Sequence, residues 1–353
     1  MPYSAQPPSA FWKNCRQSDD FLSGDLFRPK RQLVGGDRIA TAGSCFAQNI
    51  GGYIRRSSLK LVDTEPSPEE MPEDVARRFG YGLFSARYGN VYTARQLRQL
   101  LSDCVTGAVH KAAIWKGPGG AVFDGLRPGT EPEGYGSIDE LIAHRREHLT
   151  RVRAIFAEAD VFIFTLGLTE AWQHADTGLV FPTAPGVIAG AFEPARHRFA
   201  NFTFSDVLED METALSLMRE FAPDLQVILT VSPVPLTATA TPDHVLSATT
   251  YSKSVLRAVA GQLAQTYDHV DYFPSYEMIT AAPFAHASYA GNLRSVRADA
   301  VARVMSVFFG AYDVLDPPEA APVAPVLLPE DAEGDATDAL ICEEMLLDAF
   351  AKP

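Results

Sequence analysis

The apolar run of strand length at residues 160–166, with a second buried strand expected at 225–231 and another strand at 269–273, constrains the fold more than any other feature of this chain. An uninterrupted apolar run is typical of a parallel strand that helices cover on both faces. The segments around these runs carry apolar residues at helical spacing; residues 205–221, for example, begin with Ser205 as the expected N-cap. Strands that alternate with helices predict an α/β fold with a doubly wound, mostly parallel sheet.

Shorter signals complete the order of elements. A strand is expected at residues 37–40, a helix from Gln48 to Arg56 and a short strand at residues 59–62. Further helices are expected at residues 93–101, 141–158, 205–221, 252–265 and 299–309. The glycine-rich residues 115–136 are interpreted as a long connection, and the aromatic and proline-rich residues 171–204 as an excursion from the sheet.

Composition divides the chain into a lead-in, a body and a tail. Residues 1–36 form an irregular lead-in, and residues 37–312 form an α/β body with insertions at about 110–140 and 171–204. Residues 313–353 hold eleven acidic residues and one lysine, a net charge of −10 out of −14 for the whole chain. The body is therefore nearly neutral and offers no basic surface for nucleic acid. Within the tail, residues 314–340 predict a disordered linker, and residues 341–350 predict a short amphipathic helix that docks on a protein partner.

Targeting signals and cysteine usage set the expected compartment. The first residues show neither the basic region nor the apolar stretch of a secretory signal. No apolar run approaches the roughly 18 residues that span a bilayer. The four cysteines are widely spaced and form no CxxC pair: Cys15, Cys45, Cys104 and Cys342. We therefore expect a soluble, cytoplasmic protein without membrane contact.

Glycine and polar residues follow the expected strands and predict a site. They lie at Gly43-Ser44, Gly89-Asn90 and residues 167–170, with further polar stretches at residues 232–235 and 273–277. In a parallel sheet the carboxyl ends of the strands meet at one edge, and ligands bind there. Ser44 also stands at the start of a helix, where backbone N–H groups and the helix dipole favour negative charge. A serine beside such donors suits acyl transfer, in which the serine attacks and the donors stabilise an oxyanion.

The stretch Gly43-Ser44-Cys45-Phe46-Ala47 is the literal signature of the GSCFA family, and the resemblance extends over roughly residues 8–310. It includes residues 165–172, 232–235, 251–254 and 273–277. That family is similar to the SGNH/GDSL hydrolases, which implies a flavodoxin-like, three-layer α/β/α sandwich. It also implies a serine-dependent ester hydrolase or acyltransferase that needs no metal and no cofactor, acting on an acylated small molecule or carbohydrate.

The resemblance implies roles for individual residues. Ser44 takes the place of the nucleophile. Gly89 and Thr169 fall near the oxyanion positions, although Thr169 stands where the superfamily usually has asparagine. Their neighbours complete the expected substrate-binding and oxyanion-binding set: Gly43, Cys45, Asn90 and Gly167.

One part of the superfamily pattern is missing. The DxxH block, which would supply an acid and a base before the final helix, is replaced by Asn292-Leu293-Arg294-Ser295. Two loop histidines are alternative bases: His244, preceded by Asp243, and His286, which is nearer to the usual place. If neither serves, Glu170 or Glu277 would have to act. Otherwise the protein is a non-catalytic relative that binds a ligand or a protein.

Four other features are weaker signals. His144 to His148 matches the zinc-binding pattern HxxEH, but the surrounding arginines would repel a dication, and a charged surface helix is the expected structure. Cys45 is an alternative nucleophile, although a cysteine so close to a strand end usually packs as a small apolar residue. The glycines at 117–120 lack the lysine that follows a phosphate-binding loop. The aromatic residues of 171–204 either form a small local core or line a substrate cleft for a sugar.

Overall fold

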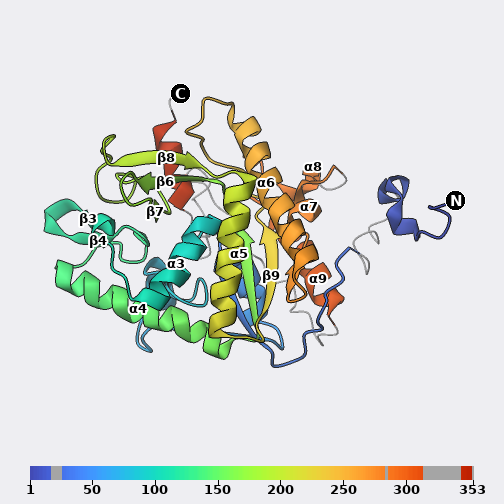
Figure 1. The fold of residues 1–353 in the computed structure, drawn as a ribbon, viewed down its shortest axis with the longest axis horizontal. Coiled ribbons are helices and arrows are strands. Elements are labelled where there is room, and N and C mark those ends of the chain that lie inside the picture. Colours follow the sequence, from blue (N-terminus) through green and yellow to red (C-terminus); the bar gives the residue numbers. More distant parts are fainter. Residues whose placement is uncertain (17–25, 283–284, 313–342, 352–353) are drawn as a thin grey trace.

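The computed structural model describes residues 1–16, 26–282, 285–312 and 343–351, and its centre is a five-stranded parallel sheet (Figure 1). The strands lie side by side in the order β2 (Lys60–Leu61), β1 (Arg38–Gly43), β5 (Val161–Leu166), β9 (Gln226–Val231) and β10 (Val270–Tyr272). All four neighbouring pairs are parallel. In order of appearance this is the arrangement 2-1-3-4-5 of flavodoxin-like folds, so the doubly wound sheet is confirmed.

Helices cover both faces of this sheet and make three layers. One face packs on α3 (Ala94–Thr106), α4 (Ile138–Glu158), α5 (Phe204–Phe221) and α6 (Val245–Thr266). The other face packs on α1 (Phe46–Arg55), α7 (Ser275–Thr280) and α9 (Ala298–Ala311). Because successive side chains of a strand point to opposite faces, Phe162 and Phe164 enter the first core, and Val161 and Ile163 enter the second.

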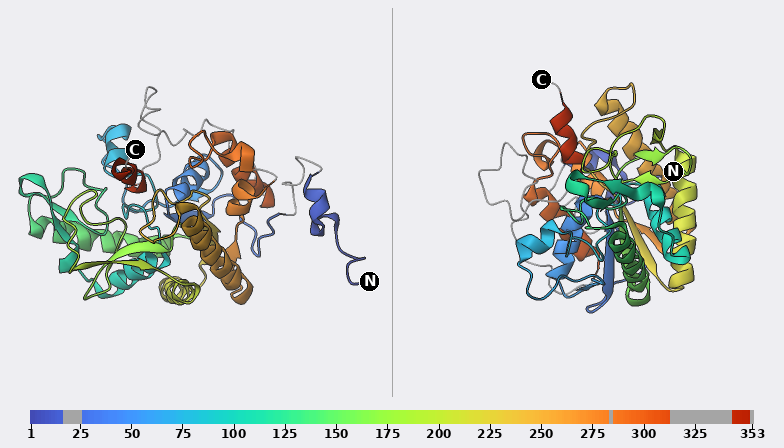
Figure 2. Two further views of the ribbon diagram at one scale, coloured as in Figure 1. Left: turned by 90° about the horizontal axis from the view of Figure 1, so that it is seen from above. Right: turned by 90° about the vertical axis from the view of Figure 1, so that its left-hand side faces the viewer.

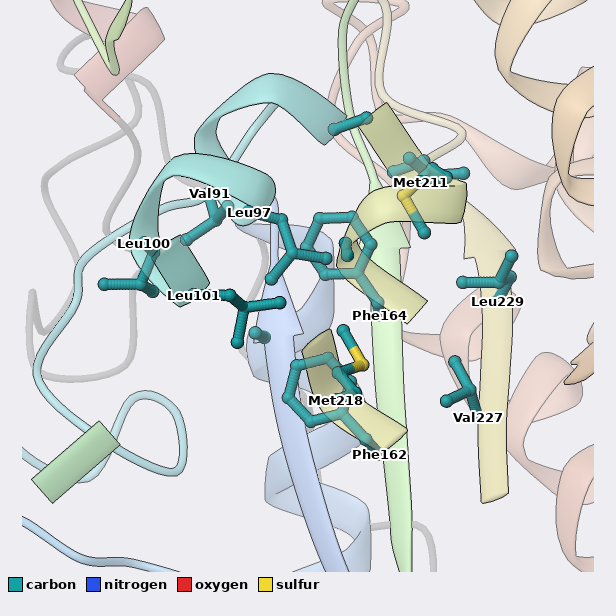
Figure 3. Packing of buried hydrophobic residues seen from close by; sticks show 14 of the residues in the cluster. Val91, Leu97, Leu100, Leu101, Phe162, Phe164, Met211, Met218, Val227 and Leu229 are labelled. Carbon is teal, nitrogen blue, oxygen red and sulfur yellow. The ribbon is translucent and has the colours of Figure 1, made fainter. Parts of the chain in front are cut away.

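Figure 3 shows the first core at β5. The rings of Phe162 and Phe164 are nearly parallel, with centroids 6.4 Å apart, and they lie beside Leu97 and Leu101 of α3 and Met218 of α5. The strand residues themselves are at most 2% exposed. This double cover explains why the strand is apolar except for Thr165 and does not alternate between apolar and polar residues.

Two helix starts differ from the sequence prediction. The N-cap of α5 is Thr203, which forms a capping box with Asp206, whereas Ser205 lies inside the first turn. Helix α6 begins at Val245 rather than at residue 252, because the His244 side chain accepts a hydrogen bond from the Leu246 backbone N–H and caps the helix there. The predicted helix at 93–101 is correct in kind, and it extends to Thr106 before Gly107 ends it in the left-handed conformation.

The two predicted insertions fold into small antiparallel sheets, which the sequence pattern did not indicate. The first contains the hairpin β3 (Ile114–Lys116) and β4 (Val122–Asp124). The second is a three-stranded sheet in the order β7 (Val180–Phe181), β6 (Glu170–His174) and β8 (His197–Asn201). The sheets share a local core in which Trp115 packs against Phe181, with ring centroids 5.1 Å apart. Part of the aromatic content of 171–204 is therefore a local core.

The helix α4 has the exposed, charged face that the sequence predicted, but its other face buries two charged or polar residues that were expected at the surface. His144 is exposed, but His148 is fully buried, and its Nδ1 lies 2.7 Å from Oε2 of Glu65. Arg145 is also buried and pairs with Asp103 at 3.1 Å. No group of three or more metal-ligating side chains occurs within the part of the chain that the structure describes.

The remaining helical segments lie around this body. They are η1 (Pro8–Ala10), η2 (Trp12–Arg16), α2 (Glu73–Arg78), η4 (Lys111–Ala113), η5 (Pro118–Gly120), α8 (Ala285–Ser288) and η7 (Glu343–Phe350). Figure 2 shows η1 and η2 set apart from the body. The short helix expected at 341–350 corresponds to η7, while the linker predicted at 314–340 falls outside the described residues. None of the helices in the described ranges has the length and apolarity needed to cross a bilayer.

Candidate active site

Ser44 lies directly after β1, at the carboxyl edge of the sheet. Strand β1 has β2 on one side and β5 on the other, so Ser44 stands where the strand order reverses, the usual ligand site of such sheets. Its backbone N–H donates to the carbonyl of Thr165 at 3.1 Å. Gly43 makes this approach possible: its φ is +137°, and a Cβ there would lie 2.4 Å from the Thr165 oxygen.

The Ser44 hydroxyl is buried at the start of α1. The residue is 3% exposed, and its Oγ has no hydrogen-bond partner among the described residues. Cys45 is the N-cap residue of α1 and is also buried. A buried hydroxyl beside a helix N-terminus stands in a field that favours the alkoxide and an anionic intermediate over their neutral forms.

Gly167, after β5, lies against Ser44 and leaves room for it. A Cβ on Gly167 would stand 3.0 Å from the Ser44 Cβ and 3.1 Å from the Tyr92 backbone oxygen. That oxygen accepts hydrogen bonds from the N–H groups of both Gly167 and Leu168, each at 2.9 Å. The end of β5 and the loop at Tyr92 are thus joined beside the serine.

The loop from Gly89 to Tyr92 forms a second wall of the site. Its Val91 N–H donates to the Gly43 carbonyl at 2.8 Å, so the loop runs along the end of β1. The side chains on either side of Val91, those of Asn90 and Tyr92, are both buried. Asn90 Nδ2 and the Tyr92 hydroxyl both donate to Oε2 of Glu343 in η7, the latter at 2.8 Å.

Thr169 lies close by, but its donors are already used. Its backbone N–H donates to Ser252 Oγ at 3.0 Å, and its hydroxyl donates to Asn201 Oδ1 at 2.7 Å. Thr169 is fully buried, so these bonds hold the loop in place and leave the residue no donor for an oxyanion.

Three residues of this region were not singled out from the sequence: Tyr92, Lys253 and Glu343. Lys253 is 1% exposed, and its Nζ donates to the Gly167 carbonyl at 2.7 Å. The signal for Lys253 was its place in the family-like stretch 251–254 and on the buried face of α6, where a lysine is unusual. Nothing in the sequence pairs Glu343 with residues some 250 positions away.

The candidate bases differ in their surroundings. His244 is exposed, and its Nδ1 accepts the Leu246 N–H at 3.1 Å, so the neutral ring carries its proton on Nε2 and has no lone pair left for a serine proton. His286 lies in α8, and its side chain is not among the described groups.

The two alternative carboxylates are engaged elsewhere. Glu170, at the start of β6, accepts the Thr239 hydroxyl at 2.7 Å and the Ala240 N–H at 3.3 Å, and burial raises its pKa. Glu277 accepts hydrogen bonds from Arg257 and from the Tyr272 hydroxyl. Each carboxylate therefore has a structural role.

A small cavity of about 70 Å³ lies beside Leu168, the residue that follows Gly167. Its wall is mainly apolar and includes Leu168, Trp172, Phe181 and Leu236, with Glu170 at the same wall. Leu347 of η7 also lines it. The space is of the order of a few heavy atoms, which suits a short acyl group.

This chain is similar to known proteins in two ways, in its fold to solved structures and in its sequence to a protein family. No curated protein matches this chain. One matching solved structure is an acetyl xylan esterase from the rumen bacterium Butyrivibrio proteoclasticus, with 10% identity and a TM-score of 0.27. The match covers 69% of this chain and 56% of the esterase, so the chain spans just over half the length of that structure. The model of the GSCFA family matches residues 38–308, which is most of the sequence, and the chain therefore belongs to the GSCFA family.

Proposed function

We propose that this protein is a serine-dependent ester hydrolase or acyltransferase with Ser44 as its nucleophile. The observation that carries the proposal is the buried Ser44 hydroxyl, which has no hydrogen-bond partner among the described residues and stands at the switch point of the sheet beside a helix N-terminus. An unsatisfied buried hydroxyl has a cost of about 1–3 kcal/mol, so its retention needs a reason. A role as nucleophile is such a reason, because a nucleophilic hydroxyl forms its hydrogen bonds with its substrate and its general base.

The surroundings of Ser44 support the same chemistry. Asn90 and Tyr92 present an amide and a phenol donor at one point, where they bind a carboxylate oxygen. Donors fixed in this way are what stabilises a tetrahedral oxyanion, and each is worth about 10²–10³ in rate. By resemblance to SGNH hydrolases, the substrate is an acylated small molecule or carbohydrate. The cavity beside Leu168 receives its acyl chain.

His286 is the proposed general base, ahead of His244. The Nδ1 of His244 is occupied by the cap of α6. His286 follows β10 and α7 in the chain, in the stretch that precedes the final helix α9. That is where the related hydrolases carry their histidine.

Labelling with a fluorescent fluorophosphonate tests the nucleophile. The full-length wild type, Ser44→Ala and the control Cys45→Ala are incubated for hours with excess probe. We expect the wild type and Cys45→Ala to be labelled and Ser44→Ala to remain unlabelled. Equal labelling of Ser44→Ala, or no labelling of any variant, contradicts the proposal and leaves a non-catalytic binding protein as the better account.

The same assay separates the two histidines. His286→Ala should lower the labelling rate about 10²-fold or more, the usual contribution of a general base, and His244→Ala should leave it within about twofold. The opposite result would place the base at His244. An unchanged rate in both variants would show that neither histidine activates Ser44.

A further inference from the structure

We propose that Asn90 and Tyr92 form a carboxylate-binding subsite next to Ser44, and that Glu343 of the chain's own tail occupies it as an intramolecular competitor of the substrate. The proposal rests on the proposed function of Ser44. It adds the chemical class that the subsite accepts and a means by which the protein limits its own activity.

The contacts of Glu343 are those of a bound ligand. One carboxylate oxygen receives both side-chain donors, and the residue is only 6% exposed although it begins a short helix at the end of the chain. Its other oxygen lies 3.7 Å and 3.4 Å from the positions that a Cβ would take on Gly89 and Gly129. A Cβ at either position would be in ordinary van der Waals contact with that oxygen, so these two loop residues lie close to the carboxylate. Hydrogen bonds to a charged acceptor are about twice as strong as neutral ones, so this pair of donors selects an anion.

The subsite belongs to the Ser44 region rather than to a separate surface. Val91, between the two donors, donates its backbone N–H to the Gly43 carbonyl. The Tyr92 carbonyl accepts a hydrogen bond from the N–H of Gly167, and Gly167 lies against the Ser44 side chain. Ester hydrolysis releases a carboxylate at such a place. Glu343 therefore resembles a bound product acid, and its charge resembles that of the oxyanion.

A second contact of the tail falls on the same site. Leu347, four residues after Glu343, lines the small apolar cavity together with Leu168 and Leu236. The segment thus presents a carboxylate to the donors and an aliphatic side chain to the cavity, the two features of a short fatty acid. A tethered ligand of this kind acts at an effective concentration on the order of millimolar, so even weak binding competes with substrate.

The test uses full-length variants and two independent readouts. Glu343→Ala removes the carboxylate, and Asp348→Ala is the matched control, because Asp348 is an exposed acid of the same helix. Hydrogen–deuterium exchange of residues 343–350 reports docking without any catalysis. The rate of fluorophosphonate labelling reports access to Ser44. We expect Glu343→Ala to exchange faster and to be labelled at least fivefold faster, while Asp348→Ala behaves as wild type.

A synthetic acetylated peptide of residues 343–350 completes the test. Added to Glu343→Ala, it should slow labelling again, and the same peptide with alanine at its first position should not.

The possible failures can be told apart. Unchanged exchange in Glu343→Ala overturns the docking, and faster exchange with an unchanged labelling rate overturns the competition while the proposed function stands. No labelling in any variant, Glu343→Ala included, overturns the proposed function, and the exchange data still decide whether Glu343 holds the tail.

Discussion

Two glycines determine where Ser44 lies. Gly43 adopts a φ of +137° against the backbone of Thr165, and Gly167 leaves the space that the Ser44 side chain fills. A side chain at Gly43 would need a backbone conformation that L-residues rarely adopt, in a place already filled by main-chain atoms. The glycine of the family signature is thus required for packing, independently of chemistry.

Gly43→Ala should therefore destabilise the fold by more than about 3 kcal/mol, because both strain and overlap oppose it. Gly310→Ala is the control: Gly310 lies in α9, where an added Cβ would have no neighbouring atom within 4 Å, so its free energy of unfolding should change by about 1 kcal/mol at most. Urea unfolding of both variants measures the difference. A Gly43→Ala protein as stable as the wild type would show that the end of β1 yields more easily than its contacts indicate.

The strands of the central sheet and the helices that cover it were predictable from the sequence because their signals are local. Residues 160–166 and 225–231 are mostly apolar, and both form buried strands within a residue of the expected bounds. The small sheets of the insertions were not predictable, because β6 alternates weakly and its partner β8 is separated from it in the chain by a long segment that includes the two-residue strand β7. The site shows the same division. Ser44 was predicted as a site residue from its turn, whereas Tyr92 and Glu343 come together only through contacts made in the folded state.

Helix α6 supports the site through Lys253. Replacing Lys253 by Met keeps the length of the side chain but leaves the Gly167 carbonyl without its donor, which has a cost of about 1–3 kcal/mol for a buried group. We expect that loss of stability together with about tenfold slower labelling of Ser44. Lys60→Met, at an exposed lysine of β2, is the control for removal of a charge. If Lys253→Met behaves like Lys60→Met in thermal unfolding and in labelling, the lysine has no positioning role.

At the scale of the whole molecule, a buried ionic network joins α4 to the body and to the first insertion. His148 of α4 bonds to Glu65, and Arg127 of the insertion lies 4.0 Å from the same carboxylate and 3.1 Å from Asp124. Burial, and next the charge of Arg127, lower the pKa of His148 to about 4. Burial would raise the pKa of Glu65, but His148 and Arg127 outweigh it and hold that pKa at about 2.

This network predicts a loss of stability in mild acid. The folded state keeps His148 neutral down to about pH 4, whereas an unfolded histidine binds a proton near pH 6.5. Below about pH 6.5 the unfolded state therefore binds more protons, and the free energy of unfolding falls, by about 2 kcal/mol at pH 5. Glu65 adds a loss in the same direction below about pH 4.5.

Urea unfolding at pH 7 and pH 5 measures this difference. His148→Asn should remove most of it, and the exposed His144→Asn should retain it. An equal pH dependence in both variants would contradict the assignment to His148.

The placement of β6 has a consequence for how relatives of this protein can differ from one another. The strand starts at Glu170, three residues after Gly167, so the second insertion begins directly beside the candidate site. Ser44 itself is positioned by β1, β5 and α1. The proposed nucleophile and β6 thus belong to different parts of the fold, because Ser44 follows a strand of the central sheet and β6 lies in a separate small sheet. If the proposed function holds, we expect relatives whose small sheet differs in length or charge at this position to differ in substrate, while the contacts of Gly43, Ser44 and Gly167 stay the same.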